Sequence, residues 1–237
     1  MSPETKQNIS TARTSDTYVD QGLRKHMLNV YNYMTSGLAL TGLIAWMTAH
    51  SQTMINLIYG TPLQWIVMLA PLGFVFFLSA RIHKMSFQSA QITFWLFAAL
   101  MGLSLASIFL VFTGVSIARV FFITAGTFAA MSIYGYTTKK DLTNFGAFLF
   151  MGLIGIIVAS IVNIFIGSTA LHFAISVIGV LVFVGLTAYD TQHIKRMYVE
   201  SDETEIAGKK AIIGSLKLYL DFINLFIMLL HLFGNRR

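Results

Sequence analysis

The sequence predicts an all-α, polytopic membrane protein with seven transmembrane helices, and three observations lead to that fold class. Hydrophobic residues make up 56% of the 237 residues. Asp, Glu, Lys and Arg together supply only 11%, about half the share that a soluble domain carries. The apolar residues form long runs of roughly 20 residues, the length that an α-helix needs to cross a bilayer. A transmembrane β-barrel would instead show short segments of alternating polarity.

Turn-forming residues and the length of each run set the boundaries of the first four segments. The first segment follows a polar stretch, residues 1–26, and the second begins after Gly60-Thr61-Pro62. Residues 87–136 form one apolar run of about 50 residues, which is too long for one span and right for two. We therefore divide this run at Thr113-Gly114.

Polar breaks separate the later segments in the same way. Lys139-Lys140-Asp141 separates the fourth from the fifth, and Gly167-Ser168-Thr169 separates the fifth from the sixth. A polar loop, residues 191–211, precedes the last segment. The seven predicted spans are residues 27–49, 62–80, 87–113, 115–136, 144–167, 170–190 and 212–233.

The distribution of basic residues predicts the orientation. We expect one seven-helix domain, residues 27–237, preceded by a polar N-terminal tail, residues 1–26, that lacks the apolar core of a cleavable signal peptide. Twelve of the sixteen Lys and Arg lie in this tail and in the loops after the second, fourth and sixth spans. The positive-inside rule then places the N-terminus in the cytoplasm. The C-terminus falls outside, against the pull of Arg236 and Arg237, so the last span is the weakest of the seven.

Several function classes are excluded or disfavoured by what the sequence lacks. The absence of cysteine removes disulfides, thiolate metal sites and cysteine nucleophiles. The net charge of +6 is spread between apolar runs rather than gathered in one patch, so we expect no nucleic-acid partner. No HExxH spacing, cofactor motif or nucleophile–base arrangement is present, so we expect neither enzymatic activity nor a bound cofactor.

Asp221 is the first candidate functional residue because it lies in the middle of the apolar last span. A carboxylate in hydrocarbon is costly, and its short side chain cannot reach the membrane surface. It must therefore be protonated or have a partner. Lys217, four residues earlier on the same helix face, could form an intrahelical ion pair with it.

Asp190 ends the sixth span and supplies a second carboxyl group. If Asp190 and Asp221 approach each other, both cannot be charged at low cost, and a shared proton would hold their helices together. Separated carboxylates are also suitable ligands for Ca²⁺. For the two side chains to meet, the sixth helix must continue beyond Asp190 or the seventh must lie shallowly. Arg81, at the end of the second span, is either a cationic partner for the pair or an ordinary positive-inside residue.

Four segments resemble the Bax inhibitor-1 family, the transmembrane Bax-inhibitor-motif proteins. Two of them surround the aspartates: Gly185-Leu186-Thr187-Ala188-Tyr189-Asp190-Thr191-Gln192 and Leu218-Tyr219-Leu220-Asp221-Phe222-Ile223-Asn224-Leu225-Phe226. Tyr134-Gly135-Tyr136-Thr137-Thr138-Lys139-Lys140-Asp141-Leu142 is similar to the family's junction between the fourth and fifth helices. The ending Phe233-Gly234-Asn235-Arg236-Arg237 is similar to bacterial inner-membrane members. The likeness covers about residues 22–237.

The resemblance implies a seven-helix fold with the last helix central, in a cytoplasmic (inner) membrane. It also implies a pH-sensitive leak for calcium, the expected permeant ion, in which Asp190 and Asp221 form the pH sensor and Arg81 latches to them. Two features depart from the family pattern. Residues 62–80 contain no acidic residue to line an ion path, and Lys217 stands where a small polar residue is expected. Because a cation one turn from Asp221 stabilises its charged form, we expect gating at lower pH than in a member without this lysine.

Two hypotheses from different classes follow. In the first, the protein is a pH-gated cation leak in the lipid bilayer, with calcium ions and protons as its ligands. In the second, it is a regulatory protein that binds and modulates a membrane protease or another membrane complex. The N-terminal tail and the 191–211 loop would be the contact surfaces for such a partner.

Overall fold

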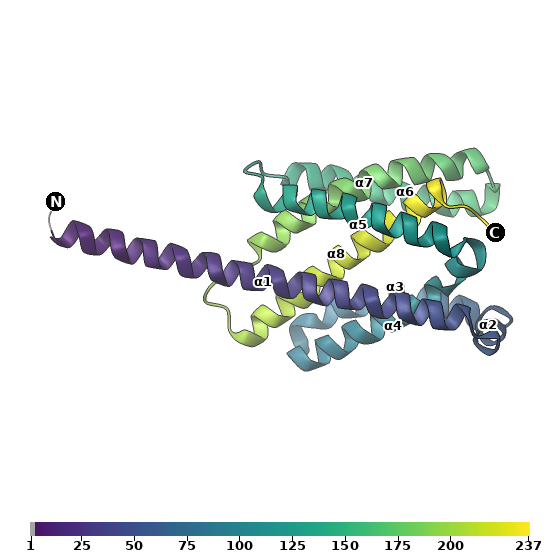
Figure 1. The fold of residues 1–237 in the computed structure, drawn as a ribbon, viewed down its shortest axis with the longest axis horizontal. Coiled ribbons are helices and arrows are strands. Elements are labelled where there is room, and N and C mark those ends of the chain that lie inside the picture. Colours follow the sequence, from purple (N-terminus) through teal and green to yellow (C-terminus); the bar gives the residue numbers. More distant parts are fainter. Residues whose placement is uncertain (1–2) are drawn as a thin grey trace.

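The computed structural model describes the backbone of residues 3–237 and the side chains of residues 21–237, and this part of the chain is almost entirely helical (Figure 1). The elements in chain order are α1 (Pro3–Ala49), α2 (Gln52–Tyr59), α3 (Leu63–Arg81), the 3-10 turn η1 (Ile82–Lys84), α4 (Phe87–Val111), α5 (Gly114–Thr137), α6 (Thr143–Ile166), α7 (Thr169–Arg196) and α8 (Thr204–Phe233). The predicted division of the long apolar run is confirmed, because Phe112 and Thr113 separate α4 from α5.

The last two helices are longer than predicted. α7 continues past the predicted end at Asp190 through Arg196, and α8 begins at Thr204 rather than at residue 212. The expected 191–211 loop is therefore wrong, and only the short turn 197–203 connects the two helices. Hydropathy ends a segment where the apolar run stops, but a helix can continue with polar side chains at the membrane surface.

Six helices, α3 to α8, have the length and hydropathy of a membrane span among the residues that the structure describes. The chain is thus a multi-pass membrane protein. α1 is not one of the six, because polar side chains such as Asn29, Asn32 and Thr35 interrupt its apolar part. The first of the seven predicted spans therefore stays a prediction. α2 was not predicted, since eight residues are too few to show a clear period.

The long helices form two groups of three, with α8 between them (Figure 1). One group contains α1, α3 and α4, and the other contains α5, α6 and α7. α8 crosses obliquely between the groups and contacts α1, α4, α5 and α7. In its most apolar stretch 67% of the residues are buried, against 11–39% in the other five spans. This arrangement confirms that the last helix is central.

Tyr219 fixes α8 to the first group. Its side chain is fully buried, and its ring meets those of Phe94 and Phe97 edge-on at 6.4 and 5.2 Å between centroids. Its hydroxyl group lies 2.7 Å from the Thr41 hydroxyl, which donates to the carbonyl oxygen of Ala98 at 2.8 Å. The buried phenol therefore has a partner, as a polar group in this environment requires.

The ends of the bundle differ in composition. The basic end contains η1 and the turns at residues 138–142 and 197–203, whereas α2 and the C-terminus lie at the opposite end (Figure 1). There the last residues pair with the α4–α5 turn. The backbone N–H of Thr113 donates to Asn235 O and that of Arg237 donates to Val111 O, both at 3.0 Å. The end of the chain is thereby attached to the junction of the two groups.

α5 and α7 approach closely at Gly135. A Cβ atom at this position would lie 2.2 Å from the carbonyl oxygen of Ala188 in α7, so only glycine fits without a backbone shift. Gly126, about two and a half turns earlier on α5, has no atom within 4 Å of the corresponding Cβ position.

We expect Gly135→Ala to destabilise the protein by about 1–3 kcal/mol, the usual cost of overpacking, and to lower Tm by several degrees. Gly126→Ala is the matched control, and its Tm should be unchanged or higher because alanine favours a helix by up to ~1 kcal/mol over glycine. Thermal unfolding of both variants in detergent measures the difference. Equal Tm values would show that the close approach of α5 and α7 does not matter for stability.

Candidate functional site

A cavity of about 940 Å³ lies where α3 of the first group faces α6 of the second. α4, α7 and α8 complete its walls, and no extensive direct contact joins α3 to α6 among the described residues. Its α3 wall is entirely apolar and consists of Met68, Pro71, Leu72 and Val75. The ionisable groups come from α7 and α8, and α4 and α6 add the hydroxyl groups of Ser104, Thr143 and Ser160.

One face of α8 points into this cavity. Lys217, Leu220, Asp221, Asn224 and Met228 line it, and they recur at the spacing of a single helix face. Asn224 was not singled out from the sequence, although its spacing from Asp221 could have placed it there. Its amide nitrogen donates to Leu220 O at 2.8 Å, which leaves the amide oxygen available as an acceptor.

The structure brings the two predicted aspartates together. Asp221 is only 5% exposed and lines the same cavity as Asp190, close enough for the two carboxyl groups to influence each other electrostatically. Oδ2 of Asp221 is buried and has no hydrogen-bond partner in the described part of the chain. The sequence suggested that Asp190 and Asp221 lie at different depths in the membrane. They meet because α7 continues past Asp190 and α8 is inclined (Figure 1).

Lys217 pairs with Asp190 rather than with Asp221. Its Nζ lies 3.5 Å from Oδ1 of Asp190, at the long limit of a hydrogen bond, and the lysine side chain is 39% exposed. The contact therefore joins α8 to α7, whereas the sequence suggested an intrahelical pair. Lys217 is the cationic partner of the carboxyl pair in this structure.

The structure does not bring Arg81 to the aspartates. Arg81 ends α3 with an exposed side chain and forms no ion pair with the described residues. The cavity wall on α3 ends at Val75, so about one and a half helical turns separate Arg81 from it. Its role as a latch stays a prediction, and it would require α3 or the side chain to move.

The residues next to Asp190 hold α7 in place. Thr191 lies 3.0 Å from the Ser132 hydroxyl of α5. Gln192 binds the turn before α6: its Oε1 accepts from Leu142 N at 2.9 Å, and its Nε2 donates to Lys140 O at 2.7 Å. These contacts give the 185–192 segment a structural role that the sequence alone did not reveal. They fix the position from which Asp190 reaches the cavity.

The same turn carries a solvent-exposed ion pair at the basic end. Oδ1 of Asp141 accepts hydrogen bonds from the Thr143 hydroxyl and backbone N–H, at 2.6 and 3.0 Å, and from Arg196 of α7 at 2.8 Å. The Thr143 hydrogen bonds and the Arg196 guanidinium lower the pKa of Asp141 from 3.8 to about 2. The ionised carboxylate thus joins the start of α6 to the end of α7.

Two carboxyl groups alone do not make a complete metal centre. Among the described residues, no three His, Cys, Asp or Glu side chains are grouped so that they could hold a metal ion. Asp190 and Asp221 could ligate a cation only with help from other oxygens, such as that of Asn224 or water.

The fold and site define a polytopic α-helical membrane protein with a buried carboxyl pair on its last two helices. A family model described as "Inhibitor of apoptosis-promoting Bax1" matches residues 23–237. Inner membrane protein YbhL of Escherichia coli (strain K12) is 51% identical over 219 residues, which cover 91% of this chain and 94% of YbhL. RP147 of Rickettsia prowazekii (strain Madrid E) is 47% identical over 229 residues, 97% of each chain. The chain belongs to the Bax inhibitor-1 family.

The lowered pKa of Asp141 predicts a specific pH dependence of stability. Because the pKa of Asp141 is lowered on folding, its contribution is fully present above about pH 3.8 and is lost as the pH falls through about 2. We expect Asp141→Asn to lower Tm near neutral pH and to approach the wild-type Tm toward pH 2. Glu200→Gln, at an exposed carboxylate of the neighbouring turn, should show no such pH-dependent difference. A constant gap between Asp141→Asn and wild type down to pH 2 would contradict the assignment.

Proposed function

We propose that this protein is a pH-sensitive cation leak in which protonation of Asp190 and Asp221 controls passage, with Ca²⁺ the ion best suited to the site. The observation that carries the proposal is the buried Oδ2 of Asp221, which has no hydrogen-bond partner among the described residues, while a second carboxyl group lies nearby. Burying a carboxylate is costly unless it is protonated, paired or bound to a cation. In this proposal the carboxyl pair therefore changes between three states: protonated, paired with a cationic side chain, and bound to a cation.

The chemistry of the cavity supports a transient cation site rather than a resident one. Ca²⁺ takes about six to eight oxygen ligands when it is bound tightly. Asp190, Asp221 and the amide of Asn224 supply fewer, so water must complete the coordination shell. A site that binds weakly releases its ion readily, which a leak requires.

Lys217 acts in this proposal as a built-in competitor for the permeant cation. Its ammonium group already neutralises part of the charge of Asp190 at 3.5 Å. A cation that reaches the pair must displace Lys217 or share Asp190 with it. When both carboxylates are charged they repel each other, and a shared proton or the lysine relieves that repulsion. The lysine thus biases the site toward its ionised, cation-free state.

A second candidate function is docking to a membrane protease or another membrane complex. The observation that favours it is α1, which is continuous from Pro3 and extends beyond the other helices at the basic end (Figure 1). The 197–203 turn is less suited to docking than the sequence suggested, because Tyr198 packs against His26 at 5.9 Å between ring centroids. If deletion of residues 1–20 removes a co-purifying protein while Asp221→Asn retains it, this function is the better one.

We expect Asp221→Asn to alter Ca²⁺ entry into proteoliposomes and to flatten its dependence on pH. The amide keeps the size of the side chain but cannot exchange the proton. Asp202→Asn, outside the cavity, is the matched control and should retain the wild-type pH profile. Both variants are first checked for monodispersity in detergent. Unchanged flux in a folded Asp221→Asn protein would refute the cation-leak proposal.

Lys217→Ser should move the midpoint of the flux-versus-pH curve upward by about one pH unit, the lower end of what a nearby opposite charge contributes. Removing the ammonium group takes away the interaction that favours the ionised pair. Lys209→Ser changes a lysine of the same helix whose Nζ contacts Glu205 instead, and it should leave the midpoint in place. A downward shift in Lys217→Ser would reverse the assigned role of this lysine.

A further inference from the structure

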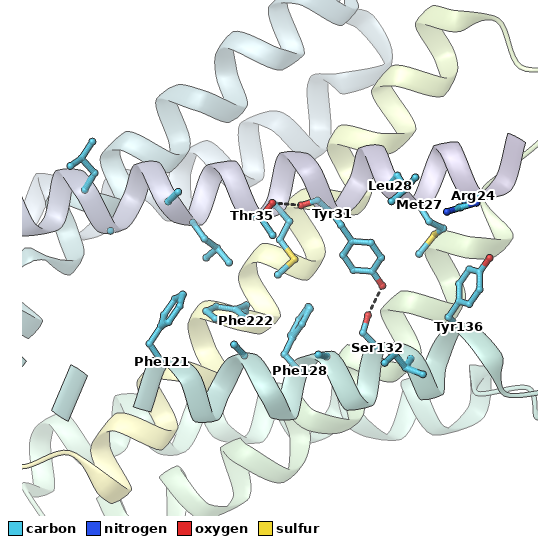
Figure 2. A pocket seen from close by; sticks show the side chains of 18 residues that line it. Arg24, Met27, Leu28, Tyr31, Thr35, Phe121, Phe128, Ser132, Tyr136 and Phe222 are labelled. Carbon is cyan, nitrogen blue, oxygen red and sulfur yellow. Dashed lines mark hydrogen bonds between the residues drawn. The ribbon is translucent and has the colours of Figure 1, made fainter. Parts of the chain in front are cut away.

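A second, apolar groove lies between the two helix groups, where α1 faces α5 (Figure 2). Its volume is about 860 Å³, and Phe222 of α8 contributes to its floor. A second cavity of about 380 Å³ shares Leu38, Gly42, Phe121 and Phe222 with it, so the two spaces are adjacent. Apart from the hydrogen bond between the Tyr31 and Ser132 hydroxyls, little direct contact joins α1 to α5 in the described part of the chain.

The groove opens to the outside of the bundle. Leu28 and Leu43 on α1 and Ile133 on α5 line it and are more than half exposed. Its walls on α1 extend from Arg24 to Leu43, which corresponds to ~28 Å of helix. This length is close to the ~30 Å thickness of the hydrocarbon core of a bilayer. The groove thus offers a lipid acyl chain an apolar channel along the membrane normal.

Positive charge is confined to one end of the groove. Arg24 is the only charged residue among the described residues that line it, and Figure 2 shows it at the same end as Tyr136. Lys195 adds a second cation there. Its Nζ donates to Tyr136 O at 2.9 Å and lies 4.7 Å from the centre of the Tyr136 ring. Among the residues whose side chains the structure describes, 21–237, no acidic side chain lines the groove.

From this arrangement we propose that the α1–α5 groove binds an anionic phospholipid, with an acyl chain along the groove and the phosphate group at Arg24. Lysine and arginine near the membrane surface attract anionic lipid headgroups. A second copy of the chain fits less well, because copies inserted in the same orientation would bring their basic ends together. The outward opening of the groove, its length and its charge at one end therefore favour a lipid as the occupant.

The acyl-chain part of the proposal is tested by filling the groove. A Cβ atom at Gly42 would have no neighbour within 4 Å, so Gly42→Leu starts a side chain in the open space of the groove. Gly126→Leu is the matched control, since Gly126 is equally unobstructed but does not line the groove. Native mass spectrometry of the delipidated full-length protein, titrated with phosphatidylglycerol or phosphatidylcholine, measures the bound lipid.

We expect phosphatidylglycerol to bind more tightly than phosphatidylcholine to the wild-type protein. Gly42→Leu should remove most of this binding, and Gly126→Leu should retain it. Arg24→Gln should weaken phosphatidylglycerol binding about fivefold, the factor that corresponds to ~1 kcal/mol per surface cation. Lys25→Gln, at the adjacent exposed lysine outside the groove, should change it less.

Three outcomes would overturn the proposal. The first is equal binding of the two lipids, and the second is equal binding to the Gly42→Leu and Gly126→Leu proteins. The third is a dimer whose formation Gly42→Leu abolishes, which would make the groove an interface between copies. Ca²⁺ flux is not part of this test, so its result is independent of the cation-leak proposal.

Discussion

The burial of α8 between two groups of helices is the constraint on which the rest of the structure depends. In a membrane there is little hydrophobic gain from packing helices together, so close approach and hydrogen bonds must hold them. Tyr219 supplies such a contact through Thr41 to the backbone of α4. Because α8 is covered by protein rather than by lipid, it can carry Lys217, Asp221 and Asn224, which would be costly on a lipid-facing helix.

The same arrangement produces the two cavities. The two groups contact each other mainly through α8, so each edge of the central helix leaves a space between them. Successive residues of α8 serve different spaces: Asp221 faces the α3–α6 cavity and Phe222 faces the α1–α5 groove. One space is therefore polar on its α8 side, and the other is apolar with a cation at one end. Helical periodicity alone gives the two sides of one helix different chemistry.

Hydropathy predicted much of this fold because long apolar runs with polar breaks admit few alternatives in a membrane. The bounds of α3, α4, α5 and α6 agree with the predicted segments within two residues. The polar ends of α7 and α8 were not predicted to be helical, because a polar sequence between two apolar runs is typical of a loop. The sequence could not decide whether Asp190 and Asp221 meet, because this depends on the inclination of α8. That inclination depends on packing with four other helices. For the same reason the sequence paired Lys217 with its neighbour on α8, whereas the structure pairs it with Asp190.

The central position of α8 also bears on how the protein is made. Synthesis proceeds from the N-terminus, so the helices of both groups emerge before the helix that separates them. Until α8 arrives, neither group has its inner surface covered, and lipid or a chaperone must occupy that space. The pairing of Asn235 and Arg237 with the α4–α5 turn follows only after α8 is complete. Assembly of this bundle is therefore a late event in biogenesis, and a chain truncated before α8 would lack its core rather than its edge.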